Sequence, residues 1–346
     1  VLARAYLVGG CVRDALLGIA QKDFDLEVYG VDYEALARGL SAHGRVDLVG
    51  KSFGVIKFSS TSGGQWDFSL PRRDSKTAAG HKGFEVAFDP DISPQEAASR
   101  RDFTINALMF DPRTGEYLDF FGGREDLAKR VLRHTSAAFV EDPLRVLRGM
   151  QFAARFDMEL APETAALSQQ LLPEAGTLAA ERIWGEWQKW AAKSIRPSAG
   201  LRVLRETGWL ALYPELVALI DCPQDPHYHP EGDVWVHTLF VCDAAATVAI
   251  RADLGEEERA VLVLAALCHD LGKPETTATA ADGRIRSFGH AQAGLAPAAA
   301  LLRRLGTPRA IGDRVLPLVA EHMAHYGMEA SPRAVRRLAV RLAPAT

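Results

Sequence analysis

The chain has 346 residues, which is long for one hydrophobic core and favours two or three domains. Hydrophobic residues make up 48% and charged residues 24%, a composition that excludes a disordered chain, a collagen and a coiled coil. The net charge of −4 argues against a protein that binds polyanions over its whole surface, although residues 301–346 carry eight arginines against three acidic residues.

No membrane span or secretory segment is expected. The longest uncharged apolar stretch, residues 260–268, is about half a membrane span, and Arg13 and Asp14 cut the apolar start of the chain. The chain begins with valine, so a few leading residues are expected to be missing. Without any CxxC pair, the four cysteines are expected to be reduced core residues of a cytoplasmic protein: Cys11, Cys222, Cys242 and Cys268.

The first 137 residues are predicted to be mixed α/β. A strand at 5–8 leads through a double glycine into a helix at 12–17, and strands follow at 24–29, 55–58 and 66–70, the last two forming a hairpin. Residues 72–83 are predicted to be a basic, glycine-containing loop. Ser93 and Glu96 are typical of a capping box, and the helix that they begin is expected to continue to Leu108.

From about Ala137 the pattern becomes helical almost throughout. Ala, Leu, Glu and Arg dominate, and no strand signal is present. Breaks at Pro214 and in the Pro-, Asp- and His-rich segment 222–230 divide this half. The sequence therefore predicts a head at 1–137, a helical neck and body at 138–225, and a second helical domain at 226–346.

Glycines and aspartates near the N-terminus form the first pattern that carries chemistry. The pair Gly9-Gly10 precedes a helix, so the backbone can approach a phosphate closely and the helix N-terminus favours an anion. Asp23 and Asp25 are two apart on a strand, so they share a face and can share divalent cations. A third carboxylate, Asp67, either completes this site or lies in solvent on an edge strand.

A second pattern follows on the helix expected at 93–108. Asp102 and Asn106 are four residues apart and would share a helix face, from which Arg101 could reach a phosphate. The alternative is a surface charge pair beside a helical asparagine. The motif alone leaves both interpretations open.

The third pattern is Asp142, Arg145 and Arg148, which step by three along a helix. A carboxylate can accept a hydrogen bond from the exocyclic amine of cytosine or adenine, while a guanidinium donates to the neighbouring ring nitrogen. Guanine and uracil would present a carbonyl to the carboxylate and be rejected. The alternative is an ordinary surface salt bridge.

In this order the motifs resemble those of the class II bacterial tRNA nucleotidyltransferases, the CCA-adding enzymes of the polymerase-β-like superfamily. The matching segments are GGCVRDALLG, DFD, SRRDFTINAL and EDPLRVLRGMQFAARF. The resemblance implies an α+β fold, in which a head with a small mixed sheet precedes an all-α neck and body. It also implies template-independent transfer of CMP and AMP from CTP and ATP to the 3′ end of tRNA, in the cytoplasm and with Mg²⁺ as cofactor.

The resemblance also assigns roles to individual residues. Asp23 and Asp25 would hold two Mg²⁺ ions, with Asp67 as the third catalytic carboxylate. The family often has an arginine where this chain has Gln151, so one phosphate or packing contact is lost or Arg155 supplies it. The residues that would bind the nucleotide are Gly10, Arg13, Arg101, Asp102, Asn106, Asp142, Arg145 and Arg148.

A separate set of histidines marks the last third of the chain: His237, His269, His290 and His322, with Asp270 next to the second of them. The segment CHDLGK resembles the HD metal-phosphohydrolase superfamily, which implies a second divalent metal such as Ni²⁺ or Mn²⁺. The closing aspartate of that superfamily would fall well after His322, so the HD domain is expected to be truncated at its C-terminus. The alternative is a helical tRNA-binding body with leftover histidines.

Two other functions remain open from the sequence. An A-adding enzyme or a poly(A) polymerase shares the head motifs, although residues 50–56 match the polymerase signature poorly, and the long segment between Asp67 and Arg100 is typical of a loop that switches between CTP and ATP. The alternative from a different class is an HD phosphohydrolase whose head senses nucleotides. The incomplete set of HD residues favours nucleotide addition over this alternative.

Overall fold

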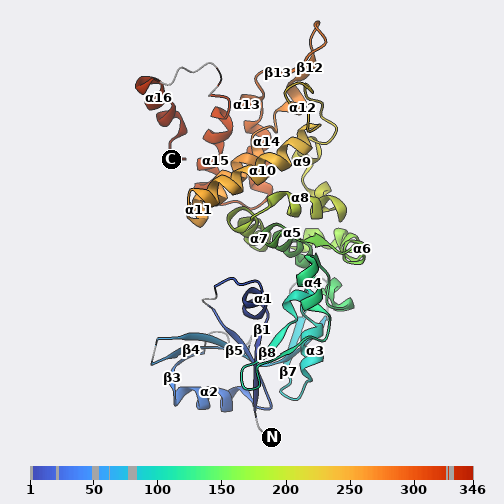
Figure 1. Cartoon of the computed structure of the whole chain (residues 1–346), viewed down its shortest axis with the longest axis vertical. Helices are drawn as coiled ribbons and strands as arrows, with labels where there is room; N and C mark the ends of the chain where they lie inside the picture. The colour runs from blue at the N-terminus through green and yellow to red at the C-terminus, as the bar shows by residue number, and fades with distance from the viewer. Residues whose placement is uncertain are drawn as a thin grey trace. The chain divides into compact units, whose positions relative to one another are not determined.

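The computed structural model describes residues 3–20, 23–48, 54–61, 63–76, 84–324, 326 and 331–345 (Figure 1). The chain forms two compact units, one of residues 1–145 and 160–177 and the other of residues 146–159 and 178–346. The expected three-part division at 137 and 225 stays a prediction.

The first unit contains most of the strands, drawn blue to teal in Figure 1. Its strands are β1 (Arg4–Val8), β2 (Asp25–Tyr29), β3 (Gly44–Asp47), β4 (Val55–Ser60), β5 (Gln65–Ser69), β6 (Arg72–Lys76), β7 (Phe84–Phe88), β8 (Met109–Asp111), β9 (Glu116–Leu118) and β10 (Val131–Leu132). Its helices are α1 (Gly10–Leu16), α2 (Tyr33–Ser41), α3 (Pro94–Ser99), α4 (Gly123–Lys129) and α6 (Pro162–Gln170), with 3₁₀ turns η3 (Thr104–Asn106), η4 (Ala137–Glu141) and η5 (Leu172–Thr177).

Seven of these strands form one sheet in the order β3-β4-β5-β2-β1-β8-β9. The β2–β5 pair is parallel, and the other pairs whose register is defined are antiparallel, including the expected hairpin of β4 and β5. Since β5 lies between β4 and β2, it is an interior strand. The alternative that placed Asp67 on an edge strand is therefore wrong.

Side chains that alternate along β1 cover the sheet on both faces. Tyr6 and Val8 pack with Tyr29 and with alanines of α3 in one buried cluster, whereas Leu7 packs with Val12 of α1 in another. The period of two along the strand thus places α1 and α3 on opposite faces. This arrangement fixes the end of β1, where the chain enters its double-glycine turn.

Two expectations about the head are wrong. The capping box exists, with Ser93 Oγ accepting from the Glu96 amide at 3.2 Å, but α3 ends at Ser99 and the helix does not reach Leu108. The Asp102 side chain accepts from the Phe103 amide at 2.8 Å, an alternative to helical bonding that lets the wholly buried Phe103 enter the core in extended backbone.

Residues 72–83 were expected to form a loop, but β6 and β7 pair from Arg72 opposite Phe88 to Lys76 opposite Phe84. The alternation of Phe84, Val86 and Phe88 is a strand pattern, which outweighs the polar composition of the preceding segment. The tip of the expected loop, residues 77–83, lies outside the described residues.

The second unit is mainly helical and runs from green to red in Figure 1. Its helices are α5 (Leu144–Phe156, which begins in the first unit), α7 (Ala180–Lys193), α8 (Pro197–Glu206), η6 (Trp209–Leu212), α9 (Pro214–Val217), α10 (Val234–Arg251), α11 (Glu256–Cys268), α12 (Lys273–Thr276), α13 (His290–Ala293), α14 (Leu295–Arg304), α15 (Arg309–Glu321) and α16 (Pro332–Leu342). Its strands are β12 (Thr277–Thr279) and β13 (Ile285–Ser287), whereas β11 (Glu159–Leu160), which pairs with β10, has one residue in each unit. The antiparallel hairpin of β12 and β13 contradicts the expectation of no strands after Ala137.

Helix α10 is long and apolar enough to cross a membrane by length and composition, and 39% of its 18-residue window is buried. Its buried side chains, including Trp235, Leu239, Cys242 and Ala246, recur at helical spacing, which is typical of the core helix of a globular domain. All four cysteines are free and buried, as expected.

Candidate functional site

The three carboxylates expected to be catalytic, of which Asp23 and Asp25 are the expected metal ligands, come together at the start of β2 and the facing position of β5. Asp25 stands opposite Asp67 in the parallel register, which the Asp67 amide fixes by donating to the Phe24 carbonyl at 2.9 Å. Asp23 precedes Asp25 by two residues, and both residues keep part of their surface exposed. A parallel pair of strands thus brings together acids that are 42 residues apart in the sequence.

The electrostatics of this group suit a cation. Desolvation raises the pKa of Asp25, and the negative charges of Asp67 and Asp23 raise it further, whereas Arg101 and Lys57 act in the opposite direction. Lys57 Nζ lies 3.3 Å from Asp67 Oδ2. Because carboxylates that repel one another are relieved by a shared cation, this donor set fits Mg²⁺, which prefers oxygen ligands.

The double-glycine turn lies beside these carboxylates, because Leu7 of β1 pairs with Leu26 of β2 and the turn begins two residues later. Gly9 has φ 70° and ψ −128°, a conformation that only glycine adopts readily. A Cβ at Gly9 would lie 2.7 Å from Nη1 of Arg101. The turn and the Arg101 guanidinium are therefore packed against each other.

The remaining polar residues of the head motifs form a buried network. Arg13, which is only 4% exposed, donates to Asp14 and to the Asn106 side chain, and Asn106 donates to Asp102 Oδ1 at 2.9 Å. The break in the helix therefore does not separate Asp102 from Asn106. In this structure Arg13 ties α1 to the segment after α3, and its nucleotide contact stays a prediction.

Asp142 and Arg145 lie at the N-terminal end of α5. Asp142 Oδ1 accepts from the Leu144 amide at 3.0 Å, while the Arg145 guanidinium donates to the carbonyls of Ala138 and Arg100 at 2.6 and 2.7 Å. Arg148 follows one turn later, with its guanidinium 5.1 Å from the centre of the Phe152 ring. These contacts hold the side chains expected to read the base.

Gln151, which replaces the arginine frequent in the family, is 1% exposed in α5. Its Nε2 is buried without a hydrogen-bond partner among the described residues. Arg155 lies over the Phe156 ring, with its guanidinium 4.7 Å from the ring centre. Gln151 therefore occupies the interior of the helical unit.

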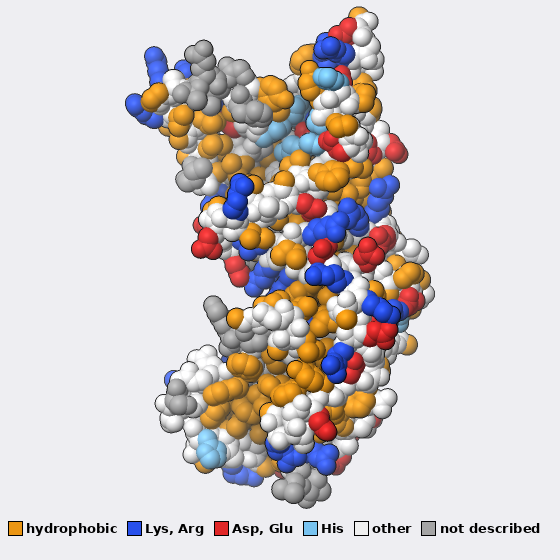
Figure 2. All heavy atoms as spheres, in the orientation of Figure 1, with side chains coloured by type: hydrophobic (Ala, Val, Ile, Leu, Met, Phe, Trp, Pro, Cys, Tyr) orange, Lys and Arg blue, Asp and Glu red, His pale blue; other side chains and the backbone are white. Residues whose placement is uncertain are grey.

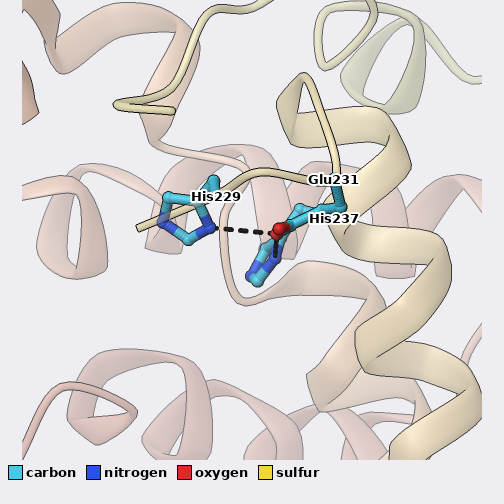
Figure 3. Close-up of side chains that lie close together, drawn as sticks. All are labelled: His229, Glu231 and His237. Atoms are coloured by element: carbon cyan, nitrogen blue, oxygen red, sulfur yellow. Dashed lines mark hydrogen bonds and ion pairs between the residues drawn. The ribbon is translucent and has the colours of Figure 1, made fainter. Parts of the chain in front are cut away.

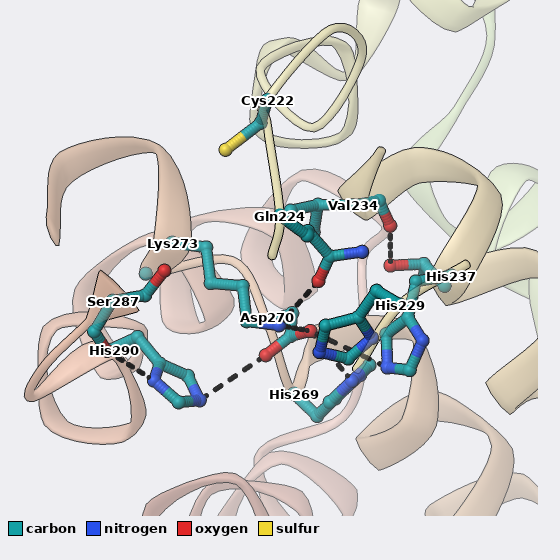
Figure 4. Close-up of polar contacts among 12 residues, drawn as sticks. Cys222, Gln224, His229, Val234, His237, His269, Asp270, Lys273, Ser287 and His290 are labelled. Atoms are coloured by element: carbon teal, nitrogen blue, oxygen red, sulfur yellow. Dashed lines mark hydrogen bonds and ion pairs between the residues drawn. The ribbon is translucent and has the colours of Figure 1, made fainter. Parts of the chain in front are cut away.

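The histidines expected to bind a metal meet around Asp270, whose carboxylate is buried at the C-terminal end of α11 (Figure 4). Asp270 Oδ2 lies 3.0 Å from His269 Nε2 and 3.7 Å from His237 Nε2. Asp270 Oδ1 lies 3.3 Å from His290 Nε2 and 3.9 Å from His322 Nε2. All five predicted residues thus form one cluster, although their elements are far apart in the sequence.

The four imidazoles also share one hydrogen-bonding arrangement. His269, His290 and His322 each use Nδ1 to donate to a backbone carbonyl at 2.7 Å, those of Ala266, Ser287 and Val319. His237 Nδ1 instead lies 2.7 Å from the Glu231 carboxylate. Since a carbonyl and a carboxylate can only accept, every Nδ1 carries the proton. Every Nε2 lies within 3.9 Å of an Asp270 oxygen, and the Nε2 atoms of His290 and His322 are also 3.0 Å apart. This is the arrangement in which histidines ligate a metal through Nε2.

The charges of the cluster fit a divalent cation. Although desolvation raises the pKa of Asp270, its contacts with His269 and Lys273 hold that pKa well below its usual value. Desolvation lowers the pKa of His322 to about 4 and also lowers that of His237, which favours neutral rings able to bind a metal. Lys273 Nζ lies 2.8 Å from Asp270 Oδ2 and donates to Gln224. The imidazole donors suit a transition metal, so the residues fit the expected class of ion.

Two residues of the site were missed from the sequence. Glu231 Oε1 lies between His229 Nδ1 at 3.1 Å and His237 Nδ1 at 2.7 Å (Figure 3). The three side chains also have the spacing of a metal-ligand group. The only signal in the sequence was their nearness in the Pro-, Asp- and His-rich segment, which was interpreted as a break between domains.

A cavity of about 930 Å³ opens onto the histidine cluster. Figure 2 shows histidine side chains gathered in this hollow of the helical unit. One wall is apolar and includes Val241, Val248 and Leu318, while Tyr228 and Phe288 contribute aromatic side chains that are mostly exposed. The cavity is large enough for a small organic phosphate next to the cluster.

Comparison with known proteins gives matches for both units. Residues 5–133 match the family model of the poly A polymerase head domain, and residues 234–343 match that of the HD domain. These matches confirm the expected fold class, a mixed α+β head followed by helices and an HD domain.

The curated relatives are similar over nearly the whole chain. A multifunctional CCA protein of Nitrosococcus oceani is 38% identical over 338 residues, which cover 96% of this chain and 78% of the relative. Its counterpart from Xanthomonas campestris pv. campestris is 41% identical over 345 residues, covering 98% and 80%. A solved tRNA nucleotidyltransferase in complex with a primer tRNA and an incoming ATP analogue shares the fold, with a TM-score of 0.59, 23% identity and coverage of 99% of this chain and 89% of that one.

Proposed function

The chain belongs to the family of the multifunctional CCA proteins, and from this premise we propose that it adds CMP and AMP from CTP and ATP to the 3′ end of tRNA without a nucleic-acid template. The reaction joins the 3′-hydroxyl oxygen of tRNA to the α-phosphorus of the nucleotide, and pyrophosphate leaves. The substrates are tRNA, CTP and ATP, and the cytoplasm, where these substrates meet, is the proposed location.

The observation that supports this proposal is the set of carboxylates on β2 and β5. Asp23, Asp25 and Asp67 would hold divalent ions, and we propose Mg²⁺ because all three donors are carboxylates. Bound there, such ions stabilise the charge on the attacking and leaving oxygens of an in-line displacement. The protein's own part is to hold the three acids in register, which it does through the backbone of an interior strand.

The double-glycine turn and Arg101 provide the proposed triphosphate site. Gly10 begins α1 directly after the turn, so its amide, at the N-terminus of the helix, can face a phosphate oxygen. Arg101 packs against Gly9, and the second edge of its guanidinium pairs with Glu27 at 3.3 Å. The buried hydrogen bonds among Arg13, Asp102 and Asn106 hold α1, the helix that follows this turn, in place.

Asp142 and Arg145 are the proposed base readers, with Arg148 as a further nucleotide contact. A carboxylate and a guanidinium at the start of one helix present an acceptor and a donor together, as cytosine and adenine require. Since the contacts of both side chains to the backbone restrict their rotamers, the pair is preorganised for selection of the base.

The test is extension of a tRNA that ends at its discriminator base, with CTP, ATP and Mg²⁺, resolved at single nucleotides. Addition of C, C and A supports the proposal. Addition of A only to a tRNA that already ends in CC indicates an A-adding enzyme, and a long A tail indicates a poly(A) polymerase. Asp25→Asn should abolish addition, whereas Asp47→Asn, an exposed acid on β3 of the same sheet, should not. Equal activity of the two variants would contradict the site.

We also propose that the HD domain hydrolyses phosphoesters with a divalent transition metal, Ni²⁺ or Mn²⁺. The convergence of four imidazoles on Asp270 at the edge of a cavity favours this second activity. Hydrolysis would add a water oxygen to phosphorus and release the ester oxygen as an alcohol. We propose this hydrolysis in addition to nucleotide addition, because the head has its own separate set of carboxylates.

Variants of the two sites should separate the two activities. His269→Ala should abolish metal-dependent hydrolysis of a phosphoester such as p-nitrophenyl phosphate while tRNA extension continues. Loss of tRNA extension by a folded His269→Ala protein would contradict the assignment of separate sites. A wild-type chain that hydrolyses no phosphoester with either metal would remove the second activity and leave a tRNA-binding domain.

A further inference from the structure

We propose that Glu231 is a positioning residue, which fixes the orientation and tautomer of His237 for metal binding and does not form a second metal site with His229 and His237. The inference rests on the proposed function of the HD domain. It assigns a task to a carboxylate that lies outside the pattern of metal ligands read from the sequence.

Glu231 supplies the one side-chain acceptor among the four groups that accept from the Nδ1 atoms around Asp270. Three of the four imidazoles around Asp270 are oriented by a backbone carbonyl, and each carbonyl belongs to the residue three positions earlier in the chain. His237 is the exception among them, because its Nδ1 contacts the Glu231 carboxylate. Without Glu231, His237 would be the ligand with no acceptor to select its Nδ1–H form.

The position of the His237 proton excludes a second cation bound by His229, Glu231 and His237. A cation bound by His229, Glu231 and His237 would need the lone pair of His237 Nδ1, where the proton now lies between the ring and Glu231. His237 Nε2 is already directed at Asp270, at 3.7 Å. An imidazole that ligated two ions would have to become an imidazolate, with no proton on either nitrogen, which is far less favourable than a hydrogen bond to a carboxylate.

Hydrogen bonds of the two residues that follow Glu231 hold its backbone in place. The loop ends at Asp233, which caps α10 by accepting from the Val236 amide at 2.8 Å and also accepts from the Asp221 amide at 2.8 Å. The Gly232 carbonyl accepts from the Gln224 side chain, and Gly232 has φ 127°, a conformation that favours glycine. The carboxylate is therefore fixed by a capped helix and a tied loop, as a positioning group must be.

The consequence is a difference between His237 and the other ligands. A carboxylate partner makes an imidazole a stronger donor than a carbonyl partner does, and loss of such a partner typically lowers metal affinity 10- to 100-fold. Glu231→Ala should therefore weaken Mn²⁺ binding by about this factor. Glu231→Gln keeps an acceptor oxygen without the charge, so its loss should be smaller than that of Glu231→Ala.

The experiment measures Mn²⁺ affinity and stoichiometry by calorimetry on the full chain and, in the metal-free protein, the ring ¹⁵N shifts of His237. Wild type should show the Nδ1–H tautomer, Glu231→Gln should retain it, and Glu231→Ala should lose it. His229→Gln, which removes the other partner of Glu231, is the matched control and should lose less affinity than Glu231→Ala.

Two results would overturn the proposal. One is an unchanged tautomer and affinity in a folded Glu231→Ala protein, with Glu231→Leu, which also removes the acceptor, serving in its place if the alanine variant does not fold. The other is a stoichiometry that falls by one ion in both Glu231→Ala and His229→Gln, which would establish a second metal site. If the wild type binds no Mn²⁺, the proposed hydrolase function fails, while the ¹⁵N shifts still decide whether Glu231 sets the tautomer.

Discussion

Replacement of Gly9 by alanine should lower both the stability of the protein and its kcat/KM for nucleotide addition. The new Cβ would stand 2.7 Å from Arg101 Nη1, so the guanidinium has to move away from the turn. The positive φ of Gly9 adds backbone strain of about 1–3 kcal/mol. If Arg101 contacts a phosphate, its displacement forfeits a charge-assisted hydrogen bond of about 1.5–3 kcal/mol, a factor of roughly 10 to 150 in kcat/KM.

Gly18→Ala is the matched control for this substitution. Gly18 has the same φ of 70°, but a Cβ there would meet nothing within 4 Å. Both variants should therefore lose stability in thermal unfolding, while Gly9→Ala alone should lose kcat/KM for CTP and ATP in tRNA extension. Equal kcat/KM for the two variants would refute the placement of Arg101 at the triphosphate.

Three further predictions concern the choice of base, the pH dependence of stability and the buried side chain of Gln151. Asp142→Ala should raise misincorporation of UTP and GTP relative to CTP and ATP by an amount that corresponds to about 1–3 kcal/mol, and an unchanged ratio would contradict the base-reading role. Burial raises the pKa of Tyr213 to about 12, although a hydrogen bond from Trp187 acts in the opposite direction. The stabilising contribution of the neutral Tyr213 phenol should therefore be complete below pH 10 and lost as pH rises to about 12. Thermal unfolding of Tyr213→Phe should lack this part of the pH dependence. Gln151→Met removes a buried Nε2 that has no hydrogen-bond partner among the residues that the structure describes, and should raise the free energy of unfolding by about 1–3 kcal/mol in urea titration. A loss of stability would reveal a partner for the amide.

The parts of the site that the sequence predicted well are residues that lie close together in the chain. Asp23 and Asp25 belong to one strand, and a period of two is enough to place them on one face. Asp67 was harder, because its position depends on a parallel pairing across 42 residues that local pattern does not contain. The resemblance to known enzymes supplied the role of Asp67 but not the pairing, and the register of β2 and β5 now accounts for its position.

The failures of sequence prediction share a physical cause, which is that tertiary contacts overrode local preference. The expected helix to Leu108 stops because Phe103 is buried completely and Asp102 bonds to the next amide. His229 and Glu231 were missed because nothing in a segment of proline, aspartate and histidine shows which acid will meet which ring. Only the fold of the loop against α10 brings them together.

The parallel register of β2 and β5 has a consequence for how this head tolerates insertions. The segment between the two strands contains α2, β3 and β4, and its length does not enter the geometry of the carboxylates as long as Asp67 still pairs opposite Asp25. Residues added between β4 and β5, next to Gly63 or Gly64, should therefore leave nucleotide addition intact if both strands keep their pairing. A single residue inserted within β5 before Asp67 would turn that carboxylate to the opposite face of the sheet, because side chains alternate along a strand. The same head thus accepts length variation freely in one place and not at all a few residues later.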